Sequence, residues 1–160
     1  MRTLPISLTV KQVMGPVVTI ESDQTVKQAL DKIIQAKIWS LLVESQGLPV
    51  GVVTEHDILR RCVAKGYNAD KVKVEEIMSS PLVTIEPDRR AGEALEKMLQ
   101  MNVGRLYVVE GGKVIGRVTQ TGLSTNLLDV LVALTNLVAT PWKLTPLRLA
   151  GNAICSSSKT

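Results

Sequence analysis

The sequence has almost no aromatic side chains: its 160 residues include two Trp, two Tyr and no Phe. Hydrophobic residues nevertheless make up 45% of the chain, so we expect a core built from Val, Ile, Leu, Ala and Met. Many of these residues are β-branched, which favours strands mixed with helices. The shortage of rings that could stack on bases argues against nucleic-acid binding.

Cysteines are also scarce. Cys62 and Cys155 show neither metal-ligand spacing nor a disulfide framework. The longest apolar stretch, residues 127–138, contains Asp129 and Asn136 and is shorter than the roughly 20 residues that span a bilayer. The N-terminus has no long apolar run, so no signal peptide is predicted. Together these features predict a cytoplasmic protein without a membrane span or a metal site.

The charge is weakly positive. Lys and Arg number 19 against 15 Asp and Glu, which gives a net charge of +4. The positive residues are scattered rather than clustered, which disfavours nucleic acid as a partner. An ordinary basic surface and a phosphorylated small-molecule ligand both fit this pattern.

An internal duplication organises the chain. The segment from Pro16 aligns without a gap with the segment from Pro81, at an offset of 65 residues. Upstream, Val13–Met14 corresponds to Ile77–Met78, with one residue inserted in the second copy. The matches include Thr19 with Thr84, Ile20 with Ile85, Glu21 with Glu86, Asp23 with Asp88, Ala29–Leu30 with Ala94–Leu95, and Gly47, Gly51 and Thr54 with Gly112, Gly116 and Thr119. So many identities in one register indicate two equivalent structural units.

Each copy predicts the order β-α-β-β-α. Short apolar runs at 17–20 and 82–85 predict strands, and paired runs at 41–43 with 50–53 and at 106–109 with 114–118 predict hairpins around Gly-containing turns. A second helix is expected from about His56 and Thr121, and Asp88 is expected to cap the first helix of the second copy. Helical spacing places on one face Val26, Ala29, Leu30, Ile33 and Ile34 in the first copy, and Ala91, Ala94, Leu95, Met98 and Leu99 in the second.

A unit of roughly 60 residues buries its apolar faces poorly alone, so we expect two pseudo-symmetric units packed together in an α/β (α+β) fold. The expected units are residues 10–66 and 74–138, followed by a tail at 139–160. Residues 127–138 predict an apolar helix that buries a dimer seam. The tail is expected to be either disordered or a strap over a partner.

The two copies resemble tandem cystathionine-β-synthase-type (CBS) domains, also called a Bateman module. The resemblance covers about residues 10–135 and rests on Val13–Met14, Val18–Thr19–Ile20, the Ala29–Leu30 helix, Leu41–Leu42–Val43 and the stretch GVVTEHDIL at 51–59. It implies clefts between the repeats that bind AMP, ADP, ATP or S-adenosylmethionine. It also implies a homodimer and a sensor that acts on an effector protein.

Thr54 and Asp57 are the leading candidate ligand residues. A predicted strand ends at Val53 and a helix follows, and N–H groups at a helix N-terminus suit a phosphate. The resemblance implies that the Thr54 hydroxyl lies beside the phosphate and that Asp57 accepts hydrogen bonds from a ribose diol. From the residues alone, Thr54 caps the helix and Asp57 stabilises its first turn, an alternative that stays open.

The resemblance also implies an apolar slot for adenine. Trp39 packs either near the base or in an interface or the core. The residues assigned to the two walls are Pro16, Val17 and Val18 on one side, and Ile38, Trp39 and Ser40 on the other.

The second copy departs from this pattern. It keeps Thr119 but has Gly122 where the acid belongs, which predicts one competent site and one degenerate site. Arg105 stands where the first copy has Ser40, either as a phosphate partner for the ligand held by Asp57 or as a surface charge. Arg117 alternates with apolar neighbours in a predicted strand, a pattern that places it toward solvent.

His56 is the sole histidine. Because no nucleophile or metal-ligand cluster accompanies it, we interpret it as a polar residue near the phosphate and predict no enzyme activity. The sequence thus predicts a regulatory module that binds an adenine nucleotide, without a catalytic cofactor, and modulates an unidentified effector protein. The alternatives are a scaffold or dimerisation module that binds no ligand, and a basic regulator associated with nucleic acid.

Overall fold

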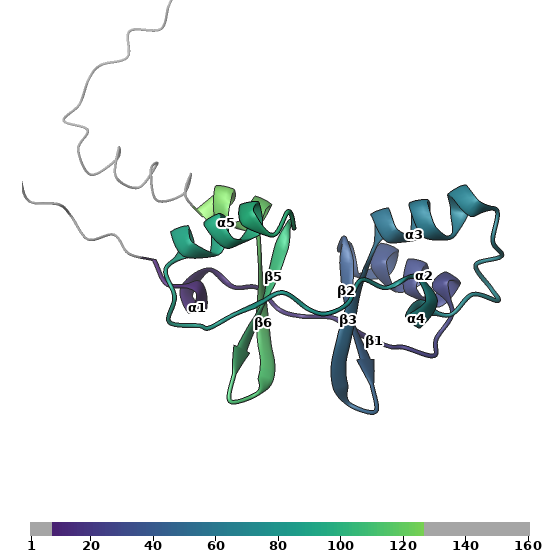
Figure 1. Ribbon diagram of the computed structural model, residues 1–160, viewed down its shortest axis with the longest axis horizontal. Helices are drawn as coiled ribbons and strands as arrows, with labels where there is room; N and C mark the ends of the chain where they lie inside the picture. The colour runs from purple at the N-terminus through teal and green to yellow at the C-terminus, as the bar shows by residue number, and fades with distance from the viewer. Residues whose placement is uncertain (1–7, 127–160) are drawn as a thin grey trace, which may run out of the picture.

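The computed structural model describes residues 8–126, and both copies have the predicted β-α-β-β-α order (Figure 1). The predicted apolar helix at 127–138 and the tail at 139–160 lie outside the described residues. The first unit contains β1 (Thr19–Glu21), α2 (Val26–Ala36), β2 (Ser40–Ser45), β3 (Leu48–Thr54) and α3 (Glu55–Arg61). The second contains β4 (Thr84–Ile85), α5 (Ala91–Gln100), β5 (Arg105–Glu110), β6 (Lys113–Thr119) and helical residues 120–126. Three short helices lie outside this pattern: α1 (Val10–Val13), η1 (Val63–Lys65) and α4 (Val74–Ile77).

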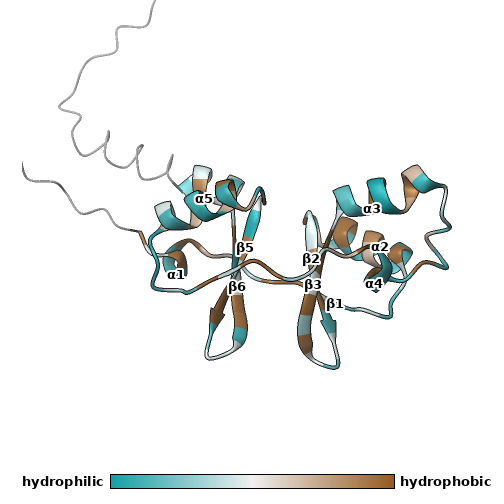
Figure 2. Cartoon of the chain, in the orientation of Figure 1, coloured by the Kyte–Doolittle hydropathy of each residue, from teal (hydrophilic) through white to brown (hydrophobic). Residues whose placement is uncertain are grey.

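Each unit has its own three-stranded sheet. In the first, β1 pairs parallel to β2, and β2 pairs antiparallel to β3; β4, β5 and β6 repeat this arrangement. The registers repeat as well, because Ile20 lies opposite Val43 and Ile85 lies opposite Val108. Figures 1 and 2 show the strands of both sheets at the centre of the molecule, with apolar runs along them and helices toward the outside.

Helix α2 forms where the 3.6-residue spacing predicts it. Thr25 caps it, accepting a hydrogen bond from the Gln28 N–H, and Val26, Ala29 and Ile33 are buried. Ile34 ends the predicted apolar face but is 63% exposed, and its counterpart Leu99 is 66% exposed. The apolar stripe is therefore wider than the core that each unit covers.

The predicted cap of α5 is wrong. Arg90, not Asp88, occupies the N-cap position, and the Glu93 carboxylate accepts its backbone N–H at 2.8 Å. The helix begins later than expected because the two residues before it are held by another segment: the Arg89 carbonyl accepts the Val10 N–H, and Arg90 forms a bridge with Thr9.

The two units exchange their leading helices. Helix α1 precedes the first unit, yet Val10 is fully buried in the core of the second. Helix α4 precedes the second unit, yet Val74 and Ile77 are buried in the core of the first. The chain must therefore cross between the units twice, at residues 14–18 and 78–83 (Figure 1).

At each crossing, one backbone lies on another. The Gly15 N–H donates to the Arg117 carbonyl at 2.8 Å, and the Val52 N–H donates to the Ser79 carbonyl at 2.9 Å. A Cβ on Gly51 would lie 2.7 Å from Met78 Sδ and 2.8 Å from the Ser79 carbonyl, and one on Gly116 would lie 2.6 Å from Met14 Sδ. The glycines matched between the repeats thus permit the close approach of the crossing segments.

We predict that Gly51→Ala destabilises the protein by about 1–3 kcal/mol, because the added methyl group overpacks the crossing. Urea unfolding followed by circular dichroism measures this change. Gly92→Ala in α5 is the matched control, since a Cβ there meets no atom within 4 Å. That control should be neutral or stabilising, because glycine costs about 0.5–1 kcal/mol in a helix. A Gly51→Ala protein as stable as the wild type would contradict the account of the crossing.

Candidate functional site

The candidate site begins where β3 ends and α3 starts. The Thr54 hydroxyl accepts the Asp57 N–H at 3.1 Å, while the Asp57 carboxylate accepts the Thr54 N–H at 3.0 Å and the Thr54 hydroxyl at 2.7 Å. This reciprocal pair is a capping box, so the local interpretation of Thr54 and Asp57 holds. The Glu55 N–H also has an acceptor, the Trp39 carbonyl at 3.4 Å, so the start of α3 offers few free N–H groups to a phosphate.

The second carboxylate oxygen of Asp57 takes no part in the cap. Its Oδ1 accepts the Ser79 hydroxyl at 3.3 Å and lies 3.5 Å from Arg61 Nη2. Arg61 in turn donates to the Ile77 and Met78 carbonyls, both at 2.8 Å. Asp57 is only 8% exposed, and it is tied to the end of α4 and to the crossing segment that follows.

Residues of the second unit complete a hollow of about 290 Å³ around Asp57, close to the lower end of the usual range of about 300–1,000 Å³ for small-molecule sites. One side comes from β3 and α3, and the other from the second crossing and the start of β5. We call it the Asp57 hollow; its lining residues are Val52, Thr54, His56, Asp57, Ser79, Pro81, Val83, Asn102, Val103, Gly104, Arg105 and Tyr107.

Arg105 brings an uncompensated positive charge to this hollow. Its Nη1 is shielded from solvent and has no hydrogen-bond partner among residues 8–126. Burial lowers the pKa of Arg105; Arg117 lowers it further, while Tyr107 and Asp57 act in the opposite direction. A shielded guanidinium N–H without an acceptor is costly, so the hollow suits a group that carries negative charge.

Tyr107 lies two residues further along β5 and is almost fully buried. Burial raises the pKa of its hydroxyl, an effect that Arg105, a hydrogen bond with Ser40 and Arg117 partly oppose. The phenol therefore stays neutral and polar at the base of the interface between the units. The Asp57 hollow thus combines a carboxylate, a guanidinium and apolar walls from Pro81, Val83 and Val103.

The structure separates the residues that the sequence grouped into one site. Thr54, His56, Asp57 and Arg105 line the Asp57 hollow. The predicted adenine walls do not; two of their members bind Arg117 instead, whose Nε donates to the Pro16 carbonyl at 3.0 Å and whose Nη1 donates to the Ser40 hydroxyl at 3.3 Å. The residues outside the hollow's lining are Pro16, Val17, Val18, Ile38, Trp39, Ser40 and Thr119.

The reason for this separation is the exchange between units. The end of β3 in the first unit faces residues of the second crossing segment and Arg105, the first residue of β5. It does not face the equivalent residues of its own unit. Adding the repeat offset of 65 to Pro16, Val18 and Ile38 gives Pro81, Val83 and Val103, which do line the hollow. The offset was thus the signal that could have found them. Trp39 is 70% exposed, and Gly104 takes its place in the hollow.

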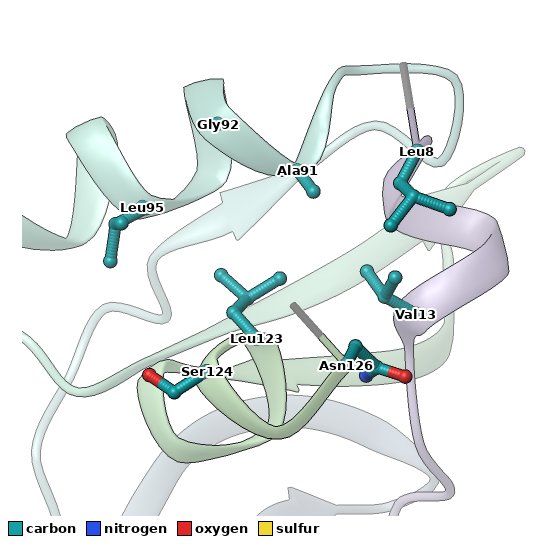
Figure 3. Close-up of a pocket in the computed structure, with 8 residues that line it drawn as sticks. All are labelled: Leu8, Val13, Ala91, Gly92, Leu95, Leu123, Ser124 and Asn126. Atoms are coloured by element: carbon teal, nitrogen blue, oxygen red, sulfur yellow. The ribbon is translucent and has the colours of Figure 1, made fainter. Parts of the chain in front are cut away.

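A second hollow, of about 210 Å³, lies between α1, α5 and helical residues 120–126 (Figure 3). Its lining carries no charged side chain and consists of Leu8, Val13, Ala91, Gly92, Leu95, Leu123, Ser124 and Asn126. In the first unit, the matching residues Val26, Leu30, Ile58 and Ile77 pack with buried Cys62, whose counterpart Leu127 lies outside the described residues. We therefore treat this hollow as part of the second core rather than as a ligand site.

Residues 8–126 hold neither a metal-ligand cluster nor a membrane-spanning helix. That part of the chain contains no group of three or more His, Cys, Asp and Glu side chains placed to hold a metal ion. It also contains no helix long and apolar enough to cross a membrane.

Comparison with known proteins shows which family the chain matches. The model of the CBS domain matches residues 10–64 and again 74–129. An uncharacterised protein of Methanopyrus kandleri is 36% identical over 101 residues, which cover 62% of this chain and 48% of the relative. The CBS domain-containing protein YhcV of Bacillus subtilis is 30% identical over 113 residues, covering 71% of this chain and 80% of the relative.

The fold also matches solved structures. An uncharacterised conserved protein from Pyrococcus horikoshii superposes with a TM-score of 0.72 at 27% identity, over 78% of this chain and 95% of that one. The chain spans about half the length of the archaeal relatives from Methanopyrus kandleri and Methanocaldococcus jannaschii.

We predict that Arg105→Met raises thermal stability, because it removes a largely buried charge that has no partner. Part of the guanidinium remains solvated, so the expected gain is about 1 kcal/mol, or about 2–4 °C in Tm. Differential scanning calorimetry measures it, with Arg60→Met on the exposed side of α3 as the control that should change little. A lower Tm for Arg105→Met would show that the guanidinium is compensated in the free protein.

Proposed function

Because the chain belongs to the CBS-domain family, we propose that it is a regulatory module that binds an adenine nucleotide (AMP, ADP or ATP) in the Asp57 hollow and modulates a partner protein. Tandem CBS-domain proteins are in general regulatory, ligand-binding modules. The observation that carries the proposal is one hollow that holds both the buried Asp57 carboxylate and the Arg105 guanidinium, whose Nη1 has no hydrogen-bond partner among residues 8–126.

Each part of a nucleotide has a complementary group there. The Asp57 carboxylate accepts hydrogen bonds from the ribose diol, as a charged acceptor does more strongly than a neutral one. Arg105 offers its free N–H donors to a phosphate. Pro81, Val83 and Val103 supply the apolar slot that a purine ring needs. Adenine thus contacts the second unit, while the ribose contacts the first.

We propose regulation rather than catalysis. His56 lines the hollow, but no nucleophile is paired with it among the described hydrogen bonds. A ligand that binds two units at once acts by favouring one of their relative arrangements, and its effect is limited by its difference in affinity for those arrangements. The output then passes through an effector protein that reads the arrangement.

We also propose that two chains pair through their helices. Ile34 on α2 and Leu99 on α5 hold equivalent positions in the two units and are both largely exposed. A second copy related by a two-fold axis would cover both side chains with the same pair from its own surface. Exposed apolar side chains at matched positions are the expected signature of such an interface.

Titration calorimetry with AMP, ADP, ATP, S-adenosylmethionine and adenosine tests the ligand proposal. We expect saturable nucleotide binding near one ligand per chain. Asp57→Asn should weaken it at least about tenfold, since hydrogen bonds to a charged group contribute about 1.5–3 kcal/mol. Arg105→Met should weaken AMP binding but leave adenosine binding nearly unchanged, because only the phosphate uses the guanidinium.

Asp70→Asn, an exposed carboxylate outside the hollow, is the matched control and should bind like the wild type. If none of these ligands gives a binding signal with any form of the protein, the nucleotide proposal is refuted and a scaffold without a ligand is favoured. Equal losses of AMP and adenosine in Arg105→Met would remove Arg105 from the phosphate site.

The pairing is tested by light scattering on a sizing column. Ile34→Glu combined with Leu99→Glu should reduce the mass from two chains to one, because charges cannot be buried in an apolar interface. Leu48→Glu is the control: Leu48 is 67% exposed but lies on the hairpin between β2 and β3. A wild-type protein that is already monomeric, or a double variant that stays paired, would contradict the proposed interface.

A further inference from the structure

The two halves of the module differ at one strand position beside the Asp57 hollow. Val52 lines the Asp57 hollow on β3, and its counterpart on β6, 65 residues later, is Arg117. We call the region around Arg117, Thr119, Pro16 and Ser40 the counterpart region, because each of these residues matches one at the Asp57 hollow. An arginine thus stands where the first half has a small apolar wall.

The guanidinium of Arg117 is bound within the counterpart region. It donates to the Pro16 carbonyl at 3.0 Å and to the Ser40 hydroxyl at 3.3 Å. The matching residues at the Asp57 hollow, Pro81 and Arg105, both line the empty space there. The side chain therefore covers the groups that face the ligand space in the other half, and it does not simply face solvent as its strand pattern indicates.

The rest of the counterpart region keeps the geometry of a site. The Gly122 N–H donates to the Thr119 hydroxyl at 3.0 Å, as the Asp57 N–H donates to Thr54 at 3.1 Å. A Cβ on Gly122 would meet only Thr119 Oγ1, at 3.0 Å, the atom whose counterpart bonds the Asp57 carboxylate. An aspartate at this position would complete a capping box with Thr119 once the Thr119 hydroxyl shifts by a few tenths of an ångström.

We infer that the counterpart region is a nucleotide site that the chain has closed with its own Arg117, so that each chain binds one nucleotide and not two. This inference rests on the proposed function, since it takes the Asp57 hollow as the pattern of a working site. It adds that two positions decide the difference: the Arg117 side chain fills the space, and Gly122 lacks the carboxylate that would accept the ribose hydroxyls. The substitutions Arg117→Val and Gly122→Asp copy the first half and should open a second site.

Arg117 can first be examined without any ligand. In the ligand-free protein, the Nε–H of Arg117 should give a ¹H–¹⁵N signal that persists near neutral pH, because it is hydrogen-bonded to the Pro16 carbonyl. Arg117→Lys should remove this one signal and so assign it. A signal for Arg117 that exchanges as fast as those of exposed arginines would overturn the inference, whatever the ligand experiments show.

Calorimetric stoichiometry with AMP and with ATP then counts the sites. We expect about one nucleotide per wild-type chain and about two for Arg117→Val/Gly122→Asp. Adding Asp57→Asn to that double variant should leave about one tight site, now in the counterpart region, whereas Asp57→Asn alone should bind its single nucleotide at least about tenfold more weakly than the wild type. Lys113→Val, an exposed position at the start of β6, is the control and should stay at one.

The outcomes separate the two claims. If the wild type binds one nucleotide and the folded double variant also binds one, this inference is overturned and the proposed function stands. If the wild type already binds two, the closure by Arg117 is refuted. If no form binds AMP or ATP, the proposed function fails, and the inference of a nucleotide site fails with it. Circular dichroism melts of the single variants Arg117→Val and Gly122→Asp verify folding, and either one can replace a double variant that does not fold.

Discussion

The arrangement of the two units depends on the backbone contacts where the chain crosses between them. Residues 14–18 lie against the edge strand β6 at Gly116, and residues 78–83 lie against the edge strand β3 at Gly51, with no room for a Cβ at either glycine. Each crossing carries a short helix into the core of one unit while its strand belongs to the other. Neither unit can therefore separate from the other without exposing apolar surface, and two small cores become one cooperative structure.

The second crossing also builds the Asp57 hollow. The Asp57 hollow takes its carboxylate from the first unit and its guanidinium, Arg105, from the second. Ser79, on the crossing segment itself, donates to Asp57. Arg61 connects that carboxylate to the last carbonyls of α4. A ligand that engages Asp57 thus competes directly with contacts that hold the units in register, which gives binding a physical path to their arrangement.

The repeat in the sequence predicted the elements and their order because strand and helix periodicities are local properties. It did not reveal which unit each segment packs against, since that depends on contacts distant in sequence. For this reason the sequence grouped Pro16 and Val18 with Asp57, whereas their counterparts Pro81 and Val83 line the Asp57 hollow. Arg117 has an alternating pattern that indicates solvent, and only the position of the Pro16 carbonyl explains its binding. Asp88 failed as a cap for the same reason, because Arg89 and Arg90 are held by the distant α1 segment.

Arg105 and Arg117 make the two halves of the module electrostatically unequal. Arg117 has its acceptors already and gains nothing when a ligand arrives. Arg105 has a buried N–H group without an acceptor, and Arg117 adds to the positive potential around it. The ligand-free state is therefore electrostatically unfavourable in one half only. Because a ligand shifts an equilibrium only by its difference in affinity for the two states, the relief of this single charge by an anion is the term that can drive the change. A module with two equivalent open sites would respond symmetrically, whereas on our proposal the response of this chain would be concentrated between Asp57 and Arg105.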